Sequence, residues 1–428
     1  MSNGDGDTDR QVGPEHDQPA ASAGVSGTVG PGAALRLLAA PVLIPTTLIW
    51  AGQGAVLPVL VLSARRLGTS SGEAALVVAL LGLGQLLGAA PAGALAARLG
   101  ERRLLLGSSA LIAGCWAAAG AATSVARLGV AVMVAGLASA AFDVARQTLV
   151  VDTVPARLRA RVMSTLGGVG RAGLFVGPLL GAAAQTGWGL AGAYTVATVL
   201  SGAAAVPLLL ERRAAPAEAH RGSAPAQRPA RVSLRGVARA NRRSLLTWGS
   251  GAAVIAAARA LRPVLLPLWA ARSDISPAAT SLLFALAGGM ELLLFYPAGS
   301  IMDRYGRARV AVPCTALMGL GLLLLPLSRT PVLLAVAAVL LGVGSGLGSG
   351  LVKTLGADAA PASDRAAFLG LWALLAETGS SGGPLIVAAL AAVSLVAASL
   401  TAAALTLAGA AWLTHLFRCR SAATMPTP

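Results

Sequence analysis

The sequence predicts an all-helical membrane protein in which twelve transmembrane helices form two parallel repeats of six. Its composition, the spacing of its apolar stretches and an internal repeat support this fold class. Of its 428 residues, 56% are hydrophobic and only 12% are charged, and the mean hydropathy is +0.74. A soluble domain carries about 25% charged residues. Most of this chain is therefore expected to lie in lipid.

Apolar stretches long enough to cross a bilayer follow one another from Leu35 onward. A helix needs about 20 such residues to span the hydrocarbon core. These stretches should be helical because every backbone polar group in lipid must be bonded internally. We expect twelve spans, at approximately residues 38–62, 74–97, 104–123, 128–152, 162–184, 190–210, 245–270, 278–301, 308–327, 332–353, 366–393 and 396–416.

An internal repeat relates the two halves of the chain. A shift of 206 residues pairs Gly177-Pro178 with Gly383-Pro384 and Asp152 with Asp358, without a gap. Each half holds an even number of spans, so both have the same orientation, as in secondary transporters whose substrate site lies between the halves near the midplane. The expected parts are a disordered tail (1–34), a first six-helix bundle (35–210), a basic cytoplasmic linker (211–243), a second six-helix bundle (244–417) and a C-terminal tail (418–428).

The distribution of basic residues predicts the orientation in the membrane. Alternation of the loops places 22 basic residues on the side of both termini and the linker, against five on the other side. The side richer in Arg and Lys is normally cytoplasmic. We therefore expect a multi-pass protein of the inner (plasma) membrane with both termini in the cytoplasm. The 33 basic residues are spread over many loops, which argues against nucleic-acid binding. The five basic residues on the other side are Arg65, Arg66, Arg127, Arg272 and Arg329.

The sequence lacks the residues that ATP hydrolysis, metal binding and enzymatic catalysis would require. Lys353 is the only lysine, and Val352 stands where a phosphate-binding loop would need glycine, so an ATP-driven pump is excluded. The cysteines show no paired spacing and the histidines fall in or beside polar segments, so we expect no metal, no cofactor and no enzyme. These residues are Cys115, Cys314, Cys419, His16, His220 and His415.

A loop motif at the end of the eighth span points to a known family. Residues 299–307, GSIMDRYGR, match the pattern G-x-x-x-D-R-x-G-R of the major facilitator superfamily. The first copy starts at Gly93 and carries Ala97 in place of the aspartate. From about Leu35 to Phe417 the chain resembles this family, which implies a twelve-span transporter that works by alternating access.

The resemblance also implies a charged latch at the cytoplasmic ends of the helices. We expect Asp358 to pair with Arg304 or Arg307, and Asp152 with Arg98 or Arg102, when the inside is closed. Glycines at these ends are expected to allow sharp turns and close helix approach. The alternative is that the arginines only set topology. The expected gating residues are Gly93, Arg98, Gly100, Arg102, Asp152, Gly299, Asp303, Arg304, Gly306, Arg307 and Asp358.

The fifth span carries a second motif. Gly173, Gly177, Pro178 and Gly181 are spaced as in the antiporter motif of the family. This similarity implies efflux of a drug or metabolite by antiport, as in multidrug transporters. The alternative is that these residues only allow tight packing with a kink, and the recurrence of the pattern in the second half favours that alternative.

Charged residues within the spans predict a substrate cavity. Each such residue costs about 2.5 to 3.5 kcal/mol on insertion scales and is by default a functional candidate. In the family's arrangement, the first, fourth, seventh and tenth spans line the central cavity. The alternative for Asp143 and Arg146 is that they only neutralise each other, three residues apart on one helix face. The expected cavity residues are Trp50, Gln53, Asp143, Arg146, Gln147, Arg259, Arg262 and Trp372.

Two further acids are candidates for proton coupling. The repeat places Arg171 beside Glu291 and Gln85 beside Glu377. An ion pair would keep Glu291 charged and structural, whereas burial beside an amide would let Glu377 gain and lose a proton. We expect Glu377 to carry the proton, with Asp143 in reserve. The alternative is that Glu377 is a permanently protonated partner of Gln85.

Together these features predict a monomeric secondary transporter that exports a small organic molecule in exchange for protons. Its partners would be that molecule, protons and the lipid bilayer. One alternative is an importer of a small metabolite, and Arg259 and Arg262 would then favour an anion. The other is a membrane protein that transports nothing, such as a sensor or a membrane-embedded transferase.

Overall fold

The computed structural model describes residues 42–154, 156–210, 234–361 and 364–423, and these contain helices and no strands. Twelve helical segments within them are long and apolar enough to span a membrane. The expected all-helical, twelve-span fold class is confirmed. The expected N-terminal tail, most of the linker and the last five residues lie outside the described part.

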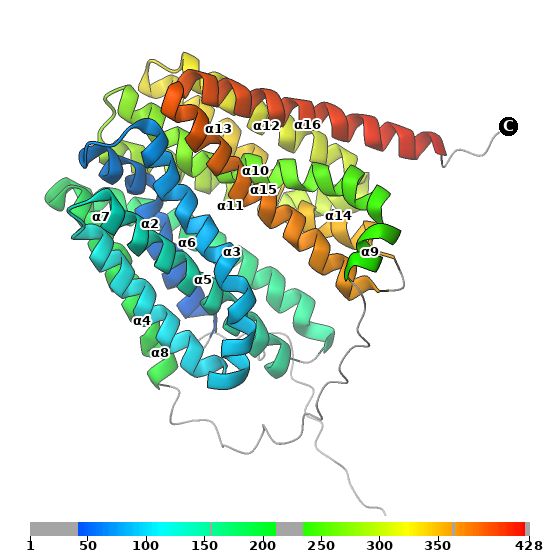
Figure 1. Cartoon of the computed structure of the whole chain (residues 1–428), viewed down its shortest axis with the longest axis horizontal. Coiled ribbons are helices and arrows are strands. Elements are labelled where there is room, and N and C mark those ends of the chain that lie inside the picture. Colours follow the sequence, from blue (N-terminus) through cyan, green and yellow to red (C-terminus); the bar gives the residue numbers. More distant parts are fainter. Residues whose placement is uncertain (1–41, 155, 211–233, 362–363, 424–428) are drawn as a thin grey trace, which may run out of the picture.

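The first half contains six spans. They are α2 (Ile44–Arg66), α3 (Ser71–Leu99), α4 (Glu101–Gly120), α5 (Val125–Thr153), α6 (Ala156–Trp188), and the pair α7 (Leu190–Ala203) with α8 (Ala205–Leu210). Helix α3 packs on α5, α2 packs on α6, and α4 packs on both α5 and α7 (Figure 1).

The second half repeats this arrangement. A short helix, α9 (Leu234–Ala240), precedes α10 (Arg242–Arg272), α11 (Pro277–Tyr305), α12 (Ala308–Leu324) with η3 (Leu325–Leu327), α13 (Pro331–Leu347) with α14 (Leu351–Ala359), α15 (Arg365–Val393) and α16 (Leu395–Ala423). Helix α11 packs on α13, α10 on α15, and α12 on both α13 and α16. The 206-residue shift maps each pair onto a pair in the first half, so the sequence repeat is also a repeat of packing.

The structure corrects three boundaries. Helix α9 forms within the segment expected to be a linker, and α16 continues to Ala423, beyond the expected start of the C-terminal tail. The tenth span is not continuous but breaks at residues 348–350, where Gly350 adopts a φ of +78°. Hydropathy could not reveal this break because apolar residues continue on both sides of it.

Glycines set the distance between the paired helices. A Cβ atom on Gly136 of α5 would lie 2.3 Å from the carbonyl oxygen of Leu81 in α3. Its repeat equivalent, Gly342 of α13, would meet Ala287 of α11 at 2.4 Å. Small residues allow membrane helices to approach until their backbones touch. The same contact therefore holds the core of both halves.

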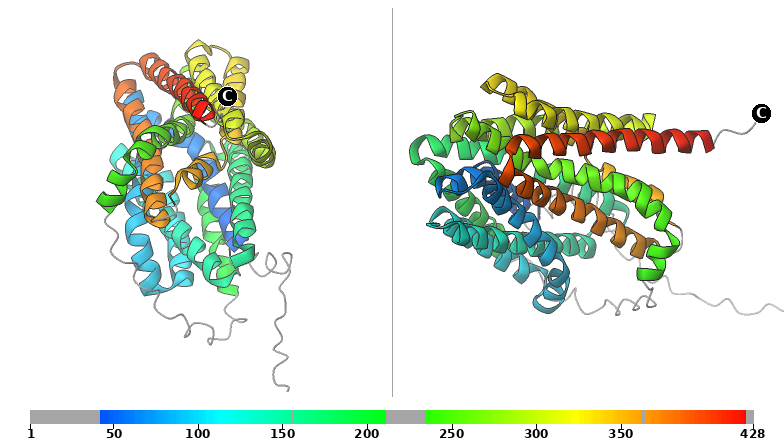
Figure 2. Two further views of the ribbon diagram at one scale, coloured as in Figure 1. Left: turned by 90° about the vertical axis from the view of Figure 1, so that its right-hand side faces the viewer. Right: turned by 45° about the horizontal axis from the view of Figure 1, so that its top comes forward.

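The two halves meet along α3 with α15 and along α6 with α11 (Figures 1 and 2). We call the end of the molecule at which α2 and α10 finish, with Arg66 and Arg272, the outer end, and the opposite end the inner end. Near the outer end, Gln185 of α6 donates a buried 2.9 Å hydrogen bond to Ser281 of α11. A Cβ on Gly72 of α3 would lie only 2.6 Å from Ala392 of α15. The halves are thus in close contact at the outer end.

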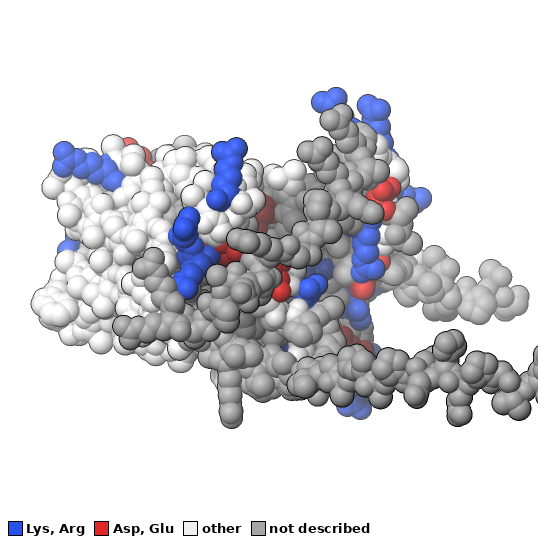
Figure 3. Space-filling view, turned by 90° about the horizontal axis from the view of Figure 1, so that it is seen from below, with Lys and Arg blue, Asp and Glu red and all other residues white. Residues whose placement is uncertain are grey.

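Charged side chains are unevenly distributed over the surface. In the view from below, uncharged residues cover most of the left-hand part, and Lys, Arg, Asp and Glu side chains become more frequent toward the right (Figure 3). A broad uncharged surface is what lipid tails require.

Candidate functional site

A pocket of about 300 Å³ lies between the two halves, deep within the spans. Its size is at the lower end of the range for small-ligand sites. Four of its residues, Trp50, Arg146, Gln147 and Arg259, were expected in a cavity. The lining residues are Trp50, Arg146, Gln147, Met163, Leu166, Gly167, Gly170, Arg171, Leu174, Arg259, Glu291 and Lys353.

Glu291 of α11 is the centre of the charged cluster in this pocket. It is only 6% exposed. Arg259 and Arg262 of α10 donate hydrogen bonds of 2.8 and 3.1 Å to its two carboxylate oxygens. The Nε atom of Arg171 in α6 lies 3.5 Å away from it, so the expected pairing of Arg171 with Glu291 is confirmed. One carboxylate therefore holds three guanidinium groups drawn from both halves.

This cluster corrects the expected surroundings of two arginines. Arg259 was placed opposite Gln53, and Arg262 on the same face, both free to contact substrate. Both instead bind Glu291, because their long side chains reach from α10 to the carboxylate on α11. Arg259 also donates a 3.3 Å hydrogen bond to the carbonyl of Gly348, where the tenth span breaks.

Helix α5 contributes a second ion pair. Asp143 and Arg146 lie 2.9 Å apart on one face, so they neutralise each other as the alternative for this pair required. Arg146 nevertheless lines the pocket.

Lys353 of α14 was missed as a cavity residue, because its place at the end of the expected tenth span suggested a cytoplasmic loop. It lines the pocket, and no hydrogen bond or ion pair joins its ammonium group to another residue in the part of the chain that the structure describes. The repeat held the signal that could have found it, since the 206-residue shift pairs Lys353 with Gln147.

Several polar atoms of the cluster are buried without a hydrogen-bond partner. The Nε atoms of Arg146, Arg171 and Arg262 donate to no atom of the described residues. An unsatisfied buried donor costs about 1 to 3 kcal/mol, and more when charged. The charged cluster therefore contains buried donors that the described residues leave unsatisfied.

Four expected cavity residues do not line the pocket: Gln53, Asp143, Arg262 and Trp372. Gln53 is half-buried within α2. Trp372 is only 3% exposed and donates a 2.8 Å hydrogen bond to the carbonyl of Val352. A Cβ on Gly356 would lie 2.6 Å from the Trp372 indole. Trp372 thus packs inside the second half, between α14 and α15.

Glu377 of α15 differs from its expected surroundings. It is exposed instead of buried, and its carboxylate accepts a 3.0 Å hydrogen bond from Ser380 on its own helix. No hydrogen bond joins it to Gln85 among the described residues. Helices α3 and α15 run antiparallel, with Gly82 facing Ser381. Gln85 and Glu377 therefore lie one turn further toward the inner end.

At the inner end, one of the two expected latches is present. Arg307 pairs with Asp358 at 2.8 Å. The pairing was expected when the inside is closed, but both residues belong to the second half, so the pair does not itself join the two halves. Asp152 and Arg98 are exposed, and Arg102 donates to the carbonyl of Leu208 instead of binding Asp152.

Of the other expected gating residues, two glycines form turns and the rest lie at exposed or loosely packed positions. Gly100 and Gly306 have φ values of +80° and +86°, which confirms the expected sharp turns. Gly93 and Gly299 were expected to permit close approach, but a Cβ on either would meet nothing within 4 Å. Asp303 is exposed, and the Arg304 guanidinium lies 5.3 Å from the Tyr305 ring centre.

The glycines of the fifth span serve helix packing in this structure. A Cβ on Gly173 or Gly177 would lie 2.7 or 2.1 Å from carbonyl oxygens of α2, and one on Gly181 would lie 3.1 Å from a third. Pro178 lies within the same contact, its Cδ 3.1 Å from a Cβ built on Gly54. Gly379 in the second half would similarly meet Ala253 of α10 at 2.2 Å.

Replacing Gly177 with Ala is therefore expected to destabilise the protein by about 1 to 3 kcal/mol, the usual cost of overpacking. The added methyl group would overlap the Ala51 carbonyl of α2. Gly187→Ala in the same helix is the matched control, because its Cβ would meet nothing within 4 Å. Thermal unfolding in detergent, followed by intrinsic fluorescence, measures both variants. Equal melting temperatures would contradict the prediction.

A polytopic helical protein with two parallel repeats and a charged pocket between them is a membrane transporter. The sequence profile of the Major Facilitator Superfamily matches residues 42–261 and again residues 247–426. The chain belongs to this superfamily, and it is a secondary transporter and not an enzyme.

Solved structures share the fold. The crystal structure of the nucleoside transporter NupG is similar with a TM-score of 0.70 and 14% sequence identity, covering 88% of this chain and 98% of that one. An auto-inhibited peptide transporter of the POT family is similar with a TM-score of 0.67 and 14% identity, covering 90% of this chain and 96% of that one. No curated protein sequence matches the chain.

Proposed function

We propose that the protein carries a small organic anion across the membrane through the central pocket, by alternating access. The supporting observation is the charge in and beside the pocket. Five cationic side chains, Arg146, Arg171, Arg259, Arg262 and Lys353, stand against the two carboxylates of Asp143 and Glu291. The three excess positive charges lie within the spans, where the dielectric constant is low and an uncompensated charge destabilises the protein. A carboxylate or phosphate group would reduce that cost.

Lys353 is the cation best placed to bind such a group, since the arginines already share carboxylates of the protein. A hydrogen bond to a charged group contributes about 1.5 to 3 kcal/mol. Trp50 on the opposite wall offers an aromatic surface to the rest of the substrate. This division suits a molecule with an acidic group at one end and an apolar or aromatic body.

Lys353→Gln is expected to reduce anion transport by about ten- to 150-fold, the equivalent of 1.5 to 3 kcal/mol. Uptake of radiolabelled monocarboxylates, dicarboxylates, phosphate esters and size-matched neutral and cationic compounds into proteoliposomes would measure it. Arg127→Gln, which removes an exposed arginine outside the pocket, is the matched control. Transport of cations alone, or equal anion transport by Lys353→Gln and the control, would contradict the proposal.

We also propose that transport is export in exchange for protons, with both termini in the cytoplasm of a cell whose inner membrane holds the protein. The spacing of the glycines in α6 favours antiport. Glu377 lies on α15 next to the interface with α3 and forms no ion pair with a cation among the described residues, and this position favours it as the proton carrier. Cells with and without the protein, assayed with and without a protonophore, would report the direction: lower substrate accumulation that the protonophore abolishes supports export, and higher accumulation supports import.

A further inference from the structure

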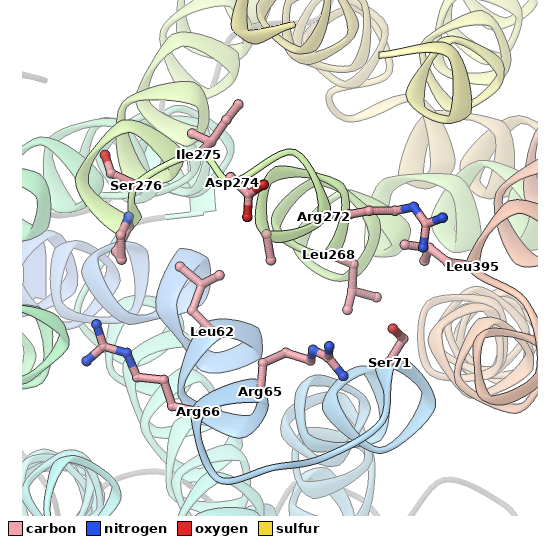
Figure 4. A pocket seen from close by; sticks show the side chains of 12 residues that line it. Leu62, Arg65, Arg66, Ser71, Leu268, Arg272, Asp274, Ile275, Ser276 and Leu395 are labelled. Carbon is pink, nitrogen blue, oxygen red and sulfur yellow. The ribbon is translucent and has the colours of Figure 1, made fainter. Parts of the chain in front are cut away.

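A second and larger pocket, of about 540 Å³, lies at the outer end between the two halves. Figure 4 shows its walls, formed by the end of α2, the start of α3, the end of α10, the loop that follows it and the start of α11. It shares no lining residue with the central pocket.

This outer pocket lies on the pseudo-two-fold axis of the protein. The 206-residue shift pairs Leu62 with Leu268 and Arg66 with Arg272, and all four residues line it. Ser71 and Pro277 form a third such pair. A ligand in this pocket contacts equivalent positions of both halves at once.

The pocket carries an excess of positive charge. Arg65 and Arg66 come from the first half and Arg272 from the second, and Asp274 is the one acid that lines it. In Figure 4 Arg65 and Arg66 extend from the same end of α2, the Arg66 and Arg272 guanidinium groups point to opposite sides of the pocket, and the Asp274 carboxylate points toward the pocket. No ion pair joins Asp274 to these arginines in the part of the chain that the structure describes. From the sequence, five arginines were expected on the side of the membrane opposite the linker. Three of them line this pocket.

This arrangement matters because the halves are in contact at the outer end. Bringing the end of α2 against the end of α10 brings Arg65 and Arg66 toward Arg272, and like charges within about 10 Å repel appreciably at physiological ionic strength. An oxyanion between Arg66 and Arg272, bound after these two flexible side chains turn inward, would replace this repulsion with attraction to both halves. Arg is well suited to this, since its guanidinium group binds the oxygens of phosphate and sulfate in pairs.

We infer that the outer pocket binds a small oxyanion of the phosphate or sulfate class, through Arg66 and Arg272, and that the bound anion holds the outer end closed. External oxyanion then shifts the conformational equilibrium toward the state that is closed outside, because a ligand favours the state to which it binds more tightly. This control is separate from substrate binding in the central pocket and does not depend on the substrate proposed above.

Distances across the outer end would test the inference. Spin labels can be placed at Gly187→Cys, where a Cβ meets nothing, and at Val393→Cys, which is 90% exposed, with the exposed Cys419 changed to Ser. The labelled protein, in nanodiscs of phosphatidylcholine at constant ionic strength, is titrated with sodium sulfate and with sodium phosphate. We expect the closed-state distance to gain population, and we expect Arg66→Gln and Arg272→Gln each to raise the sulfate concentration required by at least tenfold. Arg329→Gln, at an arginine of the outer end outside this pocket, should leave the titration unchanged.

Three outcomes would overturn the inference. The first is a distance distribution that neither sulfate nor phosphate changes. The second is an undiminished response in the double variant Arg66→Gln/Arg272→Gln. The third is a response that disappears in Lys353→Gln but not in the double variant, which would place the anion in the central pocket. Repeating the titration with phosphatidylglycerol in the nanodiscs distinguishes free oxyanion from a lipid headgroup, since a headgroup at this site would close the outer end without sulfate. Loss of organic anion transport alone would contradict the proposed function and leave this inference standing.

Discussion

Glu291→Gln is expected to destabilise the protein by about 3 to 5 kcal/mol, the cost of removing one partner from a buried ion pair. The substitution leaves Arg171, Arg259 and Arg262 facing one another around a neutral amide. The yield of folded protein should fall sharply, and the melting temperature in detergent should drop. Glu377→Gln is the matched control, because that glutamate is exposed and pairs with no cation in the described part of the chain.

A double-mutant cycle separates charge from packing in this result. If unbalanced charge causes the loss, the double variant Glu291→Gln/Arg262→Gln should lose less free energy of unfolding than the two single variants lose together. The reason is that the double variant removes one of the three cations left without a carboxylate. Strictly additive losses, or an unchanged melting temperature in Glu291→Gln, would contradict the role assigned to the cluster.

Glu377→Gln is expected to abolish proton-driven transport while sparing substrate binding and downhill exchange. A proton carrier must change its charge during the cycle, and a neutral amide cannot. In this structure Glu377 is exposed; closing α3 on α15 at the inner end would bring it to Gln85 and remove it from water. Desolvation favours the neutral carboxyl, so the movement would couple protonation to conformation.

The measurement is substrate flux in proteoliposomes under an imposed pH gradient, with an internal pH dye to follow the protons. Glu73→Gln, at an exposed carboxylate that caps α3 at the outer end, provides the matched control. Undiminished proton movement in Glu377→Gln would reject the assignment. Its loss in Asp143→Asn alone would transfer proton coupling to α5.

The fold was largely predictable from the sequence because lipid imposes one solution on an apolar chain. Long apolar stretches must be helices, and the repeat without a gap gives the parallel halves. The repeat also predicted a long-range ion pair, Arg171 with Glu291, since it relates equivalent helix pairs. Hydropathy carries no information on helix breaks, so the interruption after Leu347 was not predicted.

The site was predictable only in part, for reasons that can be stated in physical terms. Residue type identified the charges in the membrane, but it did not show that the long side chains of Arg259 and Arg262 reach from α10 to Glu291 of α11. Trp372 was expected in the cavity, whereas its side chain points toward the carbonyl of Val352. Exposure of Glu377 depends on how α15 packs on α3, which the sequence pattern does not determine.

The break in the tenth span makes α14 a separate rigid body of nine residues. Lys353 places this short helix in contact with the central pocket, and Asp358 ties its other end to Arg307 at the inner end. The two residues lie five positions apart, about 7.5 Å along the helix axis. A rotation of α14 about Gly350 therefore moves the pocket cation and the acid of the inner latch together. Substrate binding in the central pocket and the Arg307–Asp358 ion pair at the inner end would thereby be coupled through one short helix.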